Sequence, residues 1–271
     1  MKAEKDCCAG RALGAGGCGR VAFERVDVAY HGRLAVRGVP LAVAPGRTLA
    51  LVGPSGSGKS SLLFCVNRLI DLVDGATVAG RVTLDQRDVR SPEVDLLDLR
   101  RRVGMVFQRP TPFPFSIRRN LELPLQERGI AARSERADRL RAALVAVGLW
   151  DEVADRLERP ATALSGGQQQ RLCLARALVL EPEVLLLDEP CSALDPLAAA
   201  VVEESLAALK GRVTTLLVTH SLAQARRLAD DVALLWHDGS AGTLAELQPT
   251  ADFLGSPKSA LARAFVAGAG R

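Results

Sequence analysis

The sequence lacks any run of apolar residues long enough to cross a bilayer as a helix, which takes roughly 20 residues. Its most apolar stretches are interrupted: LLFCVNRLI contains Asn67 and Arg68, and VLLLDEP ends with two acidic residues and a proline. We therefore predict that the chain is not an integral membrane protein. Residues 1–20 also lack the apolar core of a secretory signal, so we expect a flexible extension there and a cytoplasmic protein.

Cysteines are few, and their spacing is irregular. Three lie in the extension and three in apolar or motif-bearing segments: Cys7, Cys8, Cys18, Cys65, Cys173 and Cys191. This scatter provides neither a disulfide framework nor the paired CxxC spacing of a zinc site, so we expect reduced thiols. A metal or membrane role of Cys7 and Cys8 is the alternative.

An excess of charge of one sign is absent as well. The 35 basic and 31 acidic residues are spread along the chain and leave a formal net charge of +4. This balance argues against a dedicated nucleic-acid surface, and we expect no nucleic-acid partner. Apolar residues make up 48% of the chain, which is enough for the packed core of a large domain.

The spacing of apolar residues changes along the chain. Residues 21–29 alternate between apolar and polar, as half-buried strands do, and the first sixth of the chain is rich in such patterns. From about residue 95 to 165 we predict an inserted helical subdomain, in which Ser134 is a candidate N-cap and Gly148 a stop. Helical patterns then alternate with buried strands from residue 164 onwards, which predicts a parallel α/β sheet.

One short segment, GPSGSGKSS at residues 53–61, combines three glycines with a single lysine. A buried strand pattern precedes it and a helical pattern follows, which is the setting of a phosphate loop. The segment fits G-x-x-x-x-G-K-[ST], in which backbone N–H groups cradle phosphates. We predict that Lys59 binds the outer phosphates and that Ser60 ligates Mg²⁺. An ordinary Gly/Ser turn is the alternative.

A second motif, VLLLDEP, places Asp188 and Glu189 at the carboxyl end of a buried strand, where α/β sheets bind ligands. We predict that Asp188 holds Mg²⁺ and that Glu189 is the general base for an attacking water, which would make the protein a hydrolase. An acidic strand end that caps a helix is the alternative for this pair taken alone.

A third motif, LSGGQ, places two glycines at the start of a helix, where they cost stability. The cost is reasonable if Gly166 and Gly167 let backbone N–H groups approach an anion, assisted by the Ser165 hydroxyl and the helix dipole. We therefore predict a second phosphate-binding surface.

Together with SALD and the histidine of TLLVTH, these motifs resemble, in content and order, the nucleotide-binding subunits of ATP-binding cassette transporters. The resemblance covers about residues 21–238. It implies an α/β fold with a P-loop, RecA-like core around a parallel sheet, an N-terminal antiparallel β subdomain and an inserted α-helical subdomain. Residues 21–271 would then form one nucleotide-binding domain that uses ATP and Mg²⁺.

The resemblance also implies roles for individual residues. Tyr30 matches the aromatic residue that stacks on adenine, although it could equally be a surface residue at a strand end. Gln108 matches the glutamine that reaches Mg²⁺ and the attacking water. His220 matches the histidine that contacts the γ-phosphate, with a buried strand-end histidine as the alternative. Asp195 matches a loop that crosses to a partner subunit.

The predicted site therefore consists of three groups of residues. The predicted catalytic residues are Glu189, His220 and Gln108. The predicted nucleotide-binding residues are Tyr30, Gly53, Pro54, Ser55, Gly56, Ser57, Gly58, Lys59, Ser60, Ser61, Ser165, Gly166, Gly167 and Gln168. The predicted Mg²⁺ ligands are Ser60, Gln108 and Asp188.

Partners are implied by the resemblance alone. In this family the LSGGQ segment of one chain faces the P-loop of another, which implies a homodimer, with a heterodimer as the alternative. FCVNRLIDL, LRRRVGMVFQRPTPFPFSI and DEPCSALDP resemble the phosphate-import branch. This implies two membrane permease subunits, an extracytoplasmic phosphate-binding protein and a place at the cytoplasmic face of the inner membrane. A polar amino acid as the solute, or a soluble ATPase without a transport role, remains the alternative.

The segment PTPFPFSI contains a candidate contact to the permease. Pro110, Pro112 and Pro114 restrict a loop that presents Phe113 and Phe115. The two rings could pack against a helix of the permease, or they could belong to the core of the helical subdomain.

Overall fold

A computed structural model describes residues 17–269 of the chain. Most of the predicted extension, with Cys7 and Cys8, lies outside the described residues. Its last residues lie against the sheet: the N–H of Gly19 donates to the carbonyl of Glu183, and the N–H of Arg20 donates to Asp85 Oδ1 over 2.8 Å.

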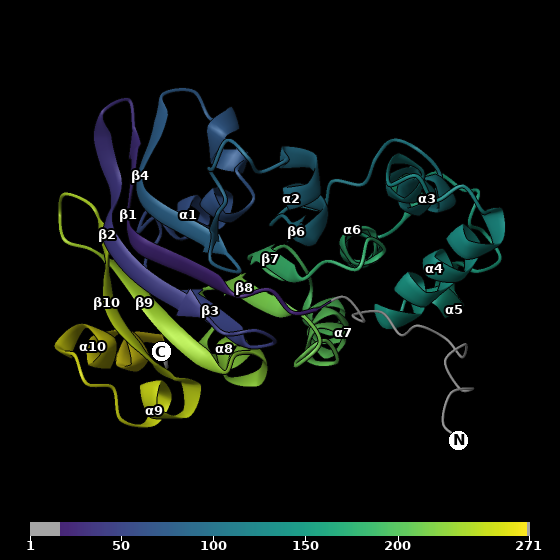
Figure 1. The fold of residues 1–271 in the computed structure, drawn as a ribbon. Helices are drawn as coiled ribbons and strands as arrows, with labels where there is room; N and C mark the ends of the chain where they lie inside the picture. Colours follow the sequence, from purple (N-terminus) through teal and green to yellow (C-terminus); the bar gives the residue numbers. More distant parts are fainter. Residues whose placement is uncertain (1–16, 270–271) are drawn as a thin grey trace, which may run out of the picture.

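The described residues form one mixed sheet of ten strands in the order β5-β4-β1-β2-β10-β9-β3-β8-β7-β6 (Figure 1). The strands are β1 (Val21–Tyr30), β2 (Arg33–Val43), β3 (Thr48–Val52), β4 (Ala76–Leu84), β5 (Arg87–Asp88), β6 (Val103–Val106), β7 (Val184–Asp188), β8 (Thr214–Val218), β9 (Asp231–His237) and β10 (Gly242–Pro249). Neighbours from β9 to β6 pair in parallel, whereas β1, β2, β4 and β5 pair antiparallel. The predicted α/β fold with an antiparallel N-terminal part is confirmed.

Helices cover both faces of the parallel strands. They are α1 (Lys59–Val66), α2 (Leu96–Arg102), α3 (Ile117–Glu127), α4 (Arg133–Ala146), α5 (Trp150–Val153), α6 (Gly166–Leu178), α7 (Pro196–Ala207), α8 (Leu222–Leu228), α9 (Thr250–Gly255) and α10 (Ala260–Ala269). Short 3-10 turns lie at Leu69–Leu72 and Ala161–Ala163. Within residues 17–269, no helix combines the length and the apolarity that crossing a membrane requires.

The central strand β3 explains this layering. All five of its residues are buried. Leu49 and Leu51 pack in the cluster that contains Leu62 of α1, whereas Ala50 and Val52 pack in the cluster of α8, α9 and α10. A strand buried on both faces reads as a continuous apolar run, and its carboxyl end is free to carry the glycine-rich loop.

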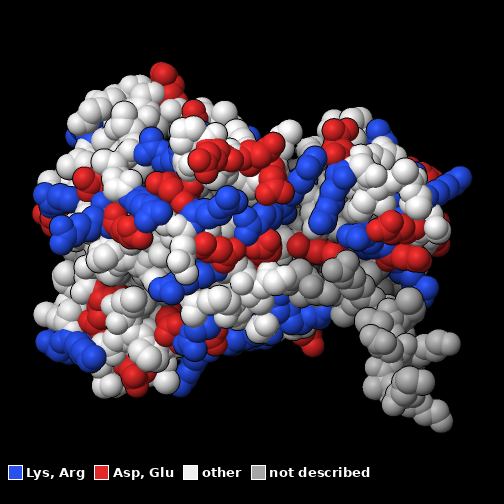
Figure 2. Space-filling model, in the orientation of Figure 1, with Lys and Arg blue, Asp and Glu red and all other residues white. Residues whose placement is uncertain are grey.

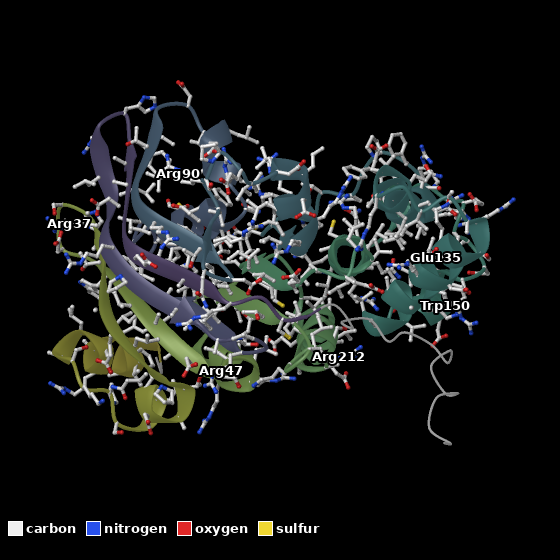
Figure 3. All side chains as sticks on the ribbon, viewed as in Figure 1. Arg37, Arg47, Arg90, Glu135, Trp150 and Arg212 are labelled. Atoms are coloured by element: carbon white, nitrogen blue, oxygen red, sulfur yellow. The ribbon has the colours of Figure 1, made fainter. Side chains whose placement is uncertain are left out.

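The helical layer α3 to α5 lies to one side of the sheet (Figure 1). Figure 3 labels Glu135 and Trp150 in this layer, far from Arg37 and Arg90 beside the strands. Its core includes Ile117, Leu121, Leu125, Leu140 and Leu144, all at most 1% exposed.

Two details of the predicted insertion are wrong. Residues 103–106 lie within the predicted helical insertion, but they form the strand β6. Val103 and Val106 are buried and pair with β7. The N-cap of α4 is Ala132 rather than Ser134, and it makes no side-chain capping bond. The stop at Gly148 is confirmed by its left-handed φ of 61°.

Charged side chains of both signs alternate over the face shown in Figure 2. The ion pairs in the described residues include Arg47 with Asp231, Arg102 with Asp85 and Glu183, and Lys210 with Asp230. These surface pairs join segments that are far apart in sequence, although exposed pairs contribute only about 0–1 kcal/mol each.

Candidate nucleotide-binding site

The loop between β3 and α1 is shaped by its glycines. Gly53, Gly56 and Gly58 have φ angles of 138°, 80° and 85°, which residues with side chains rarely adopt. A Cβ on Gly53 would lie 2.0 Å from the carbonyl oxygen of Leu235, and one on Gly58 would lie 2.2 Å from Cγ2 of Val36. The loop is therefore packed against β9 and β2, and it ends at the N-terminus of α1, where helices attract anions.

Lys59, the first residue of α1, is almost fully buried, with 5% of its surface exposed. Its ammonium donates to the carbonyl oxygens of Gly53 (2.9 Å) and Pro54 (2.8 Å). Burial lowers the pKa of Lys59 below its usual value, and the carboxylates of Glu189 and Asp188 oppose this shift. A buried cation of this kind gains from an anionic ligand, and phosphate oxygens can supply that charge.

Ser60 and Asp188 bring together two oxygens from segments 128 residues apart, since Ser60 Oγ donates to Asp188 Oδ1 over 2.9 Å. Burial raises the pKa of Asp188; the hydrogen bond from Ser60 lowers it, and the adjacent charge of Glu189 raises it. A cation bound here would relieve the repulsion between the two carboxylates. Mg²⁺ fits these residues, because it prefers oxygen ligands and usually takes one or two from the protein and others from phosphates.

Glu189 contacts both other predicted catalytic residues. His220 Nε2 lies 2.5 Å from Glu189 Oε1, and Gln108 Nε2 donates to Glu189 Oε2 over 3.1 Å. The φ of Glu189 is 47°, a left-handed conformation that costs of order 1–3 kcal/mol in a residue with a side chain. Its N–H donates to the carbonyl of Val218 at the end of β8. Three strand ends thus converge on one carboxylate, which can accept a proton from a bound water.

The SGGQ segment forms a capping box at the start of α6. Ser165 Oγ accepts from the N–H of Gln168 (3.3 Å), and Gln168 Oε1 accepts from the N–H of Ser165 (3.0 Å). A Cβ on Gly166 would have no atom within 4 Å, whereas one on Gly167 would lie 2.7 Å from Cβ of Ala198 in α7. Gly166 is therefore open to a ligand, and Gly167 has a packing reason that the sequence did not reveal.

Within the part of the chain that the structure describes, no hydrogen bond or ion pair connects the SGGQ segment with the P-loop. Instead, Gln168 Nε2 donates to Glu152 Oε2 of α5 over 2.6 Å, and Glu152 Oε1 pairs with Arg171. The hydrogen bond from Arg171, with smaller help from Gln168, lowers the pKa of Glu152, although partial desolvation acts in the opposite direction. The segment is thus fastened to the helical layer.

Two further predicted residues have local structural contacts. Tyr30 Oη donates to Ser61 Oγ over 2.8 Å, which places the ring at the first turn of α1. Asp195 is the N-cap of α7 and accepts from the N–H groups of Leu197 and Ala198. Tyr30 and Ser61 therefore lie together beside the P-loop.

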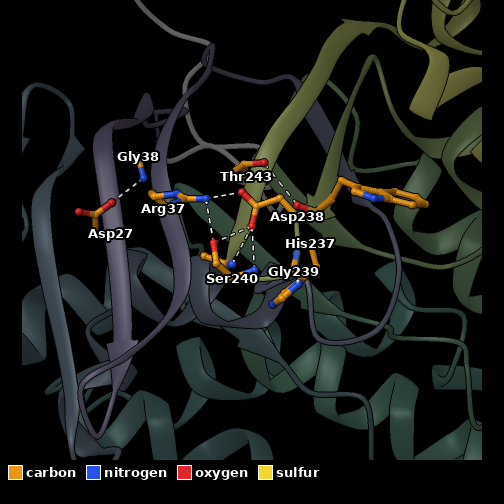
Figure 4. Close-up of polar contacts among 10 residues, drawn as sticks. Asp27, Arg37, Gly38, His237, Asp238, Gly239, Ser240 and Thr243 are labelled. Atoms are coloured by element: carbon orange, nitrogen blue, oxygen red, sulfur yellow. Dashed lines mark hydrogen bonds and ion pairs between the residues drawn. The ribbon is translucent and has the colours of Figure 1, made fainter.

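The sequence analysis missed Gly242, at the start of β10. A Cβ there would lie 2.1 Å from the carbonyl oxygen of Ser57 in the P-loop. The turn before it is fixed by Asp238, which accepts from Ser240 and forms an ion pair with Arg37 of β2 (Figure 4). No motif surrounds Gly242, so only the three-dimensional packing marks it as part of the site.

The C-terminal helix also reaches the site. A hollow of about 360 Å³ is lined by Gly53, Pro54, His220, Trp236, Ala264, Phe265 and Gly268. The helix that carries the last three residues, α10, is held at its other end by the buried Glu246 of β10, which accepts from the N–H groups of Lys258 (3.0 Å) and Ser259 (2.6 Å). One wall beside the P-loop thus comes from the C-terminal segment.

The fold and the convergent site define a nucleotide-binding domain of the P-loop class. A sequence profile described as "ABC transporter" matches residues 36–192. The chain is also 49% identical, over 97% of its length and 92% of the relative's, to the "Phosphate import ATP-binding protein PstB 1" of Nitrosococcus oceani. Proteins of the same name from Mycobacterium bovis and Mycobacterium tuberculosis are 42% and 41% identical over 92% of this chain and 98% of theirs. The chain belongs to the ABC transporter family.

Proposed function

We propose that this chain is the ATP-hydrolysing subunit of an importer of inorganic phosphate. The hydrolytic part is supported by one observation above all, the contacts of Gln108 and His220 with Glu189 beside the Ser60–Asp188 pair. The solute is supported by the relatives named for phosphate import, which match at least 92% of the chain.

In the proposed mechanism, the N–H groups at the start of α1 bind the phosphates of ATP, and Lys59 exchanges its carbonyl partners for phosphate oxygens. The ring of Tyr30 stacks on adenine. Ser60, Asp188 and Gln108 would hold Mg²⁺, which would supply positive charge to the phosphates. Because Ser60 and Asp188 already share a hydrogen bond, little rearrangement is needed to place their oxygens around a cation.

Glu189 acts as the general base that takes a proton from the attacking water. A positioned base of this kind contributes typically about 10²–10⁴-fold to the rate. Gln108 orients the water, and His220 donates to the γ-phosphate. Both side chains contact Glu189 in the structure, so the approach of a γ-phosphate and a water replaces contacts within this trio by contacts to the substrate.

The remaining phosphate ligands come from a second copy of the chain in a homodimer with two composite sites. Ser165 to Gln168 of one copy bind the nucleotide held by the P-loop of the other, which suits the open position of Gly166. Phe113 and Phe115, which are 37% and 46% exposed, contact one of two membrane permease subunits at the cytoplasmic face of the inner membrane. An extracytoplasmic phosphate-binding protein delivers the ion.

Uptake of radiolabelled orthophosphate tests this proposal in phosphate-starved cells whose own import ATPase is deleted. The cells carry the permease subunits with the wild-type chain, with Glu189→Gln, or with Glu93→Gln, which changes an exposed glutamate without an ion pair among the described residues. We expect uptake with the wild type and with Glu93→Gln. Glu189→Gln should bind ATP with unchanged affinity but lose at least about 10² in hydrolysis, together with uptake.

Each part of the proposal can fail separately. If the purified wild-type protein hydrolyses ATP but restores no phosphate uptake, the solute is wrong, and uptake of polar amino acids is the next assay. If Glu189→Gln hydrolyses ATP at the wild-type rate, the general base is wrong. If the protein fails to sediment with membranes that contain the permease, the transport role itself is wrong.

A further inference from the structure

The loop of residues 107–115, which contains Gln108 and the exposed Phe113 and Phe115, is attached to α6 at two places. At the first place, the buried Gln170 donates through Nε2 to the carbonyl of Phe107 over 3.1 Å. At the second place, Arg176 Nη2 donates to the carbonyl of Thr111 over 3.0 Å, and its guanidinium lies 4.1 Å from the ring centre of Phe113. The helix that begins with the SGGQ segment therefore carries residues 107–113 on its side.

Asn120 of α3 completes the attachment. Its side chain is fully buried, and Oδ1 accepts from the N–H of Phe113 (2.7 Å) and from Arg176 Nη1 (3.3 Å). Its Nδ2 donates to the carbonyls of Phe113 (3.1 Å) and Ser116 (3.0 Å). The rings of Phe113 and Phe115 meet edge to face at 6.4 Å. Fixing Phe113 therefore also restrains Phe115.

The contacts of Arg176 with the loop and with Asn120 fix the position of its side chain. Within the described residues it makes no ion pair, and its guanidinium donates to the Thr111 carbonyl, to the Asn120 amide and, over 3.9 Å, to Cys173 Sγ, while it also lies over the face of Phe113. A partly buried cation without a carboxylate relies on such neutral acceptors and on a ring face to offset its desolvation. Its orientation and that of the loop are therefore determined together.

The length of α6 gives the contact a functional consequence. The helix has 13 residues and spans about 20 Å. The SGGQ residues lie at its first end and Arg176 lies in its last turn. A helix of this length moves as a stiff rod, so a displacement of the SGGQ end is passed to whatever is fastened near the other end.

We propose that Arg176 is a positioning residue that fixes Phe113 and Phe115 to α6, so that both rings move together with the SGGQ segment when nucleotide binds. This inference rests on the proposed function for its biological use, because the rings are there proposed to contact the permease. The attachment itself is a property of the isolated chain. The two can therefore be tested separately.

Hydrogen exchange of the full-length protein, followed by mass spectrometry, measures the attachment directly. Arg176→Met keeps the apolar stem and removes the guanidinium. The matched control is Arg128→Met, since Arg128 Nη1 also donates to a backbone carbonyl, that of Leu180, without touching the loop. We expect exchange at the amides of Phe113 and Phe115 to rise about tenfold in Arg176→Met, equal to about 1.4 kcal/mol, and to stay unchanged in the control.

The second readout is ATP hydrolysis with and without permease subunits in membranes. For Arg176→Met we expect basal hydrolysis within about twofold of the wild type and at least about tenfold less stimulation by the permease. Arg176→Lys retains the charge and a donor group but not the planar fork of the guanidinium, so it should recover part of the stimulation, and it serves as the test variant if the methionine variant does not fold.

Three results would overturn the inference: unchanged exchange at Phe113 and Phe115, equal acceleration by Arg128→Met, or full stimulation in both Arg176 variants. A wild-type protein that the permease fails to stimulate would instead contradict the proposed function. The exchange experiment would still decide whether Arg176 holds the loop.

Discussion

The contact between Gly242 and the P-loop leads to a quantitative prediction for Gly242→Ala. The new Cβ would lie 2.1 Å from the carbonyl oxygen of Ser57, and real Cβ atoms do not approach other atoms more closely than 3.0 Å. One of the two segments must therefore shift by about 1 Å. The φ of Gly242 is not left-handed, so the effect is steric and not a matter of backbone strain.

The P-loop is the segment expected to move. Gly242 is paired with His237 of β9 and with Val36 of β2, and the turn before it is held by Asp238 and Arg37 (Figure 4). The P-loop lies outside the strands of the sheet and is rich in glycine. Overpacking of this size costs about 1–3 kcal/mol. If the cost falls on the nucleotide-binding conformation, the affinity for ATP drops roughly 5- to 150-fold.

Isothermal titration with ATP and thermal denaturation of the same preparations check this prediction. Gly255→Ala is the control, since a Cβ there would have no atom within 4 Å. We expect Gly242→Ala to bind ATP more weakly than the wild type. The loss of folding stability, measured by the melting temperature, should be smaller than the loss of binding free energy. Wild-type affinity in Gly242→Ala would refute the reasoning. A large loss of melting temperature with normal affinity would show that β10, not the P-loop, had moved.

Two predictions concern titrating groups. Burial raises the pKa of Glu246, but hydrogen bonds from Ser259, Lys258 and Gln248 outweigh it and lower the pKa, so its stabilisation is present at neutral pH and is lost as the pH falls below about 4.5. Glu246→Gln should lower the melting temperature at pH 7, and its difference from the wild type should shrink as the pH falls from about 4.5 through the lowered pKa of Glu246; a difference that stays constant over this range would contradict the prediction. Burial raises the pKa of Cys65 and Cys191 to about 12, so peptide mapping after alkylation at pH 8 should find the buried Cys65 unmodified and the half-buried Cys191 labelled only slowly in the native protein, and rapid labelling of Cys65 would contradict its burial.

Local patterns predicted the elements that hold the P-loop and the acidic strand end. Lys59 and Asp188 lie in short motifs, and each motif stands between a strand and a helix whose patterns are visible in the sequence. The structure confirms these strands and the helix after the first motif, because the pattern of about ten neighbouring residues is enough to predict a buried strand and the loop that follows it. The strand β6 was not predicted, because four residues in a helix-rich stretch give no periodic signal.

Several site features depended on contacts between distant segments. Gly242 meets the P-loop from across the sheet, and Gln170 and Arg176 reach the loop around Gln108 from a separate helix. In the sequence, these residues are a glycine that follows a short run of small residues, one glutamine of three and an arginine in a helical pattern. Nothing in the local sequence distinguishes these residues from others of their type, and only their contacts with distant segments give them a role at the site.

The sequence by itself determined the class of fold and the family, and it predicted the residues proposed to bind the phosphates, because each motif encodes its own backbone geometry within a few residues. Only the tertiary structure decided that His220 and Gln108 both contact Glu189 and that α6 fastens the phenylalanine loop. The physical reason is that such contacts depend on how strands and helices pack against one another, and packing distances of a few ångströms are not written in local sequence.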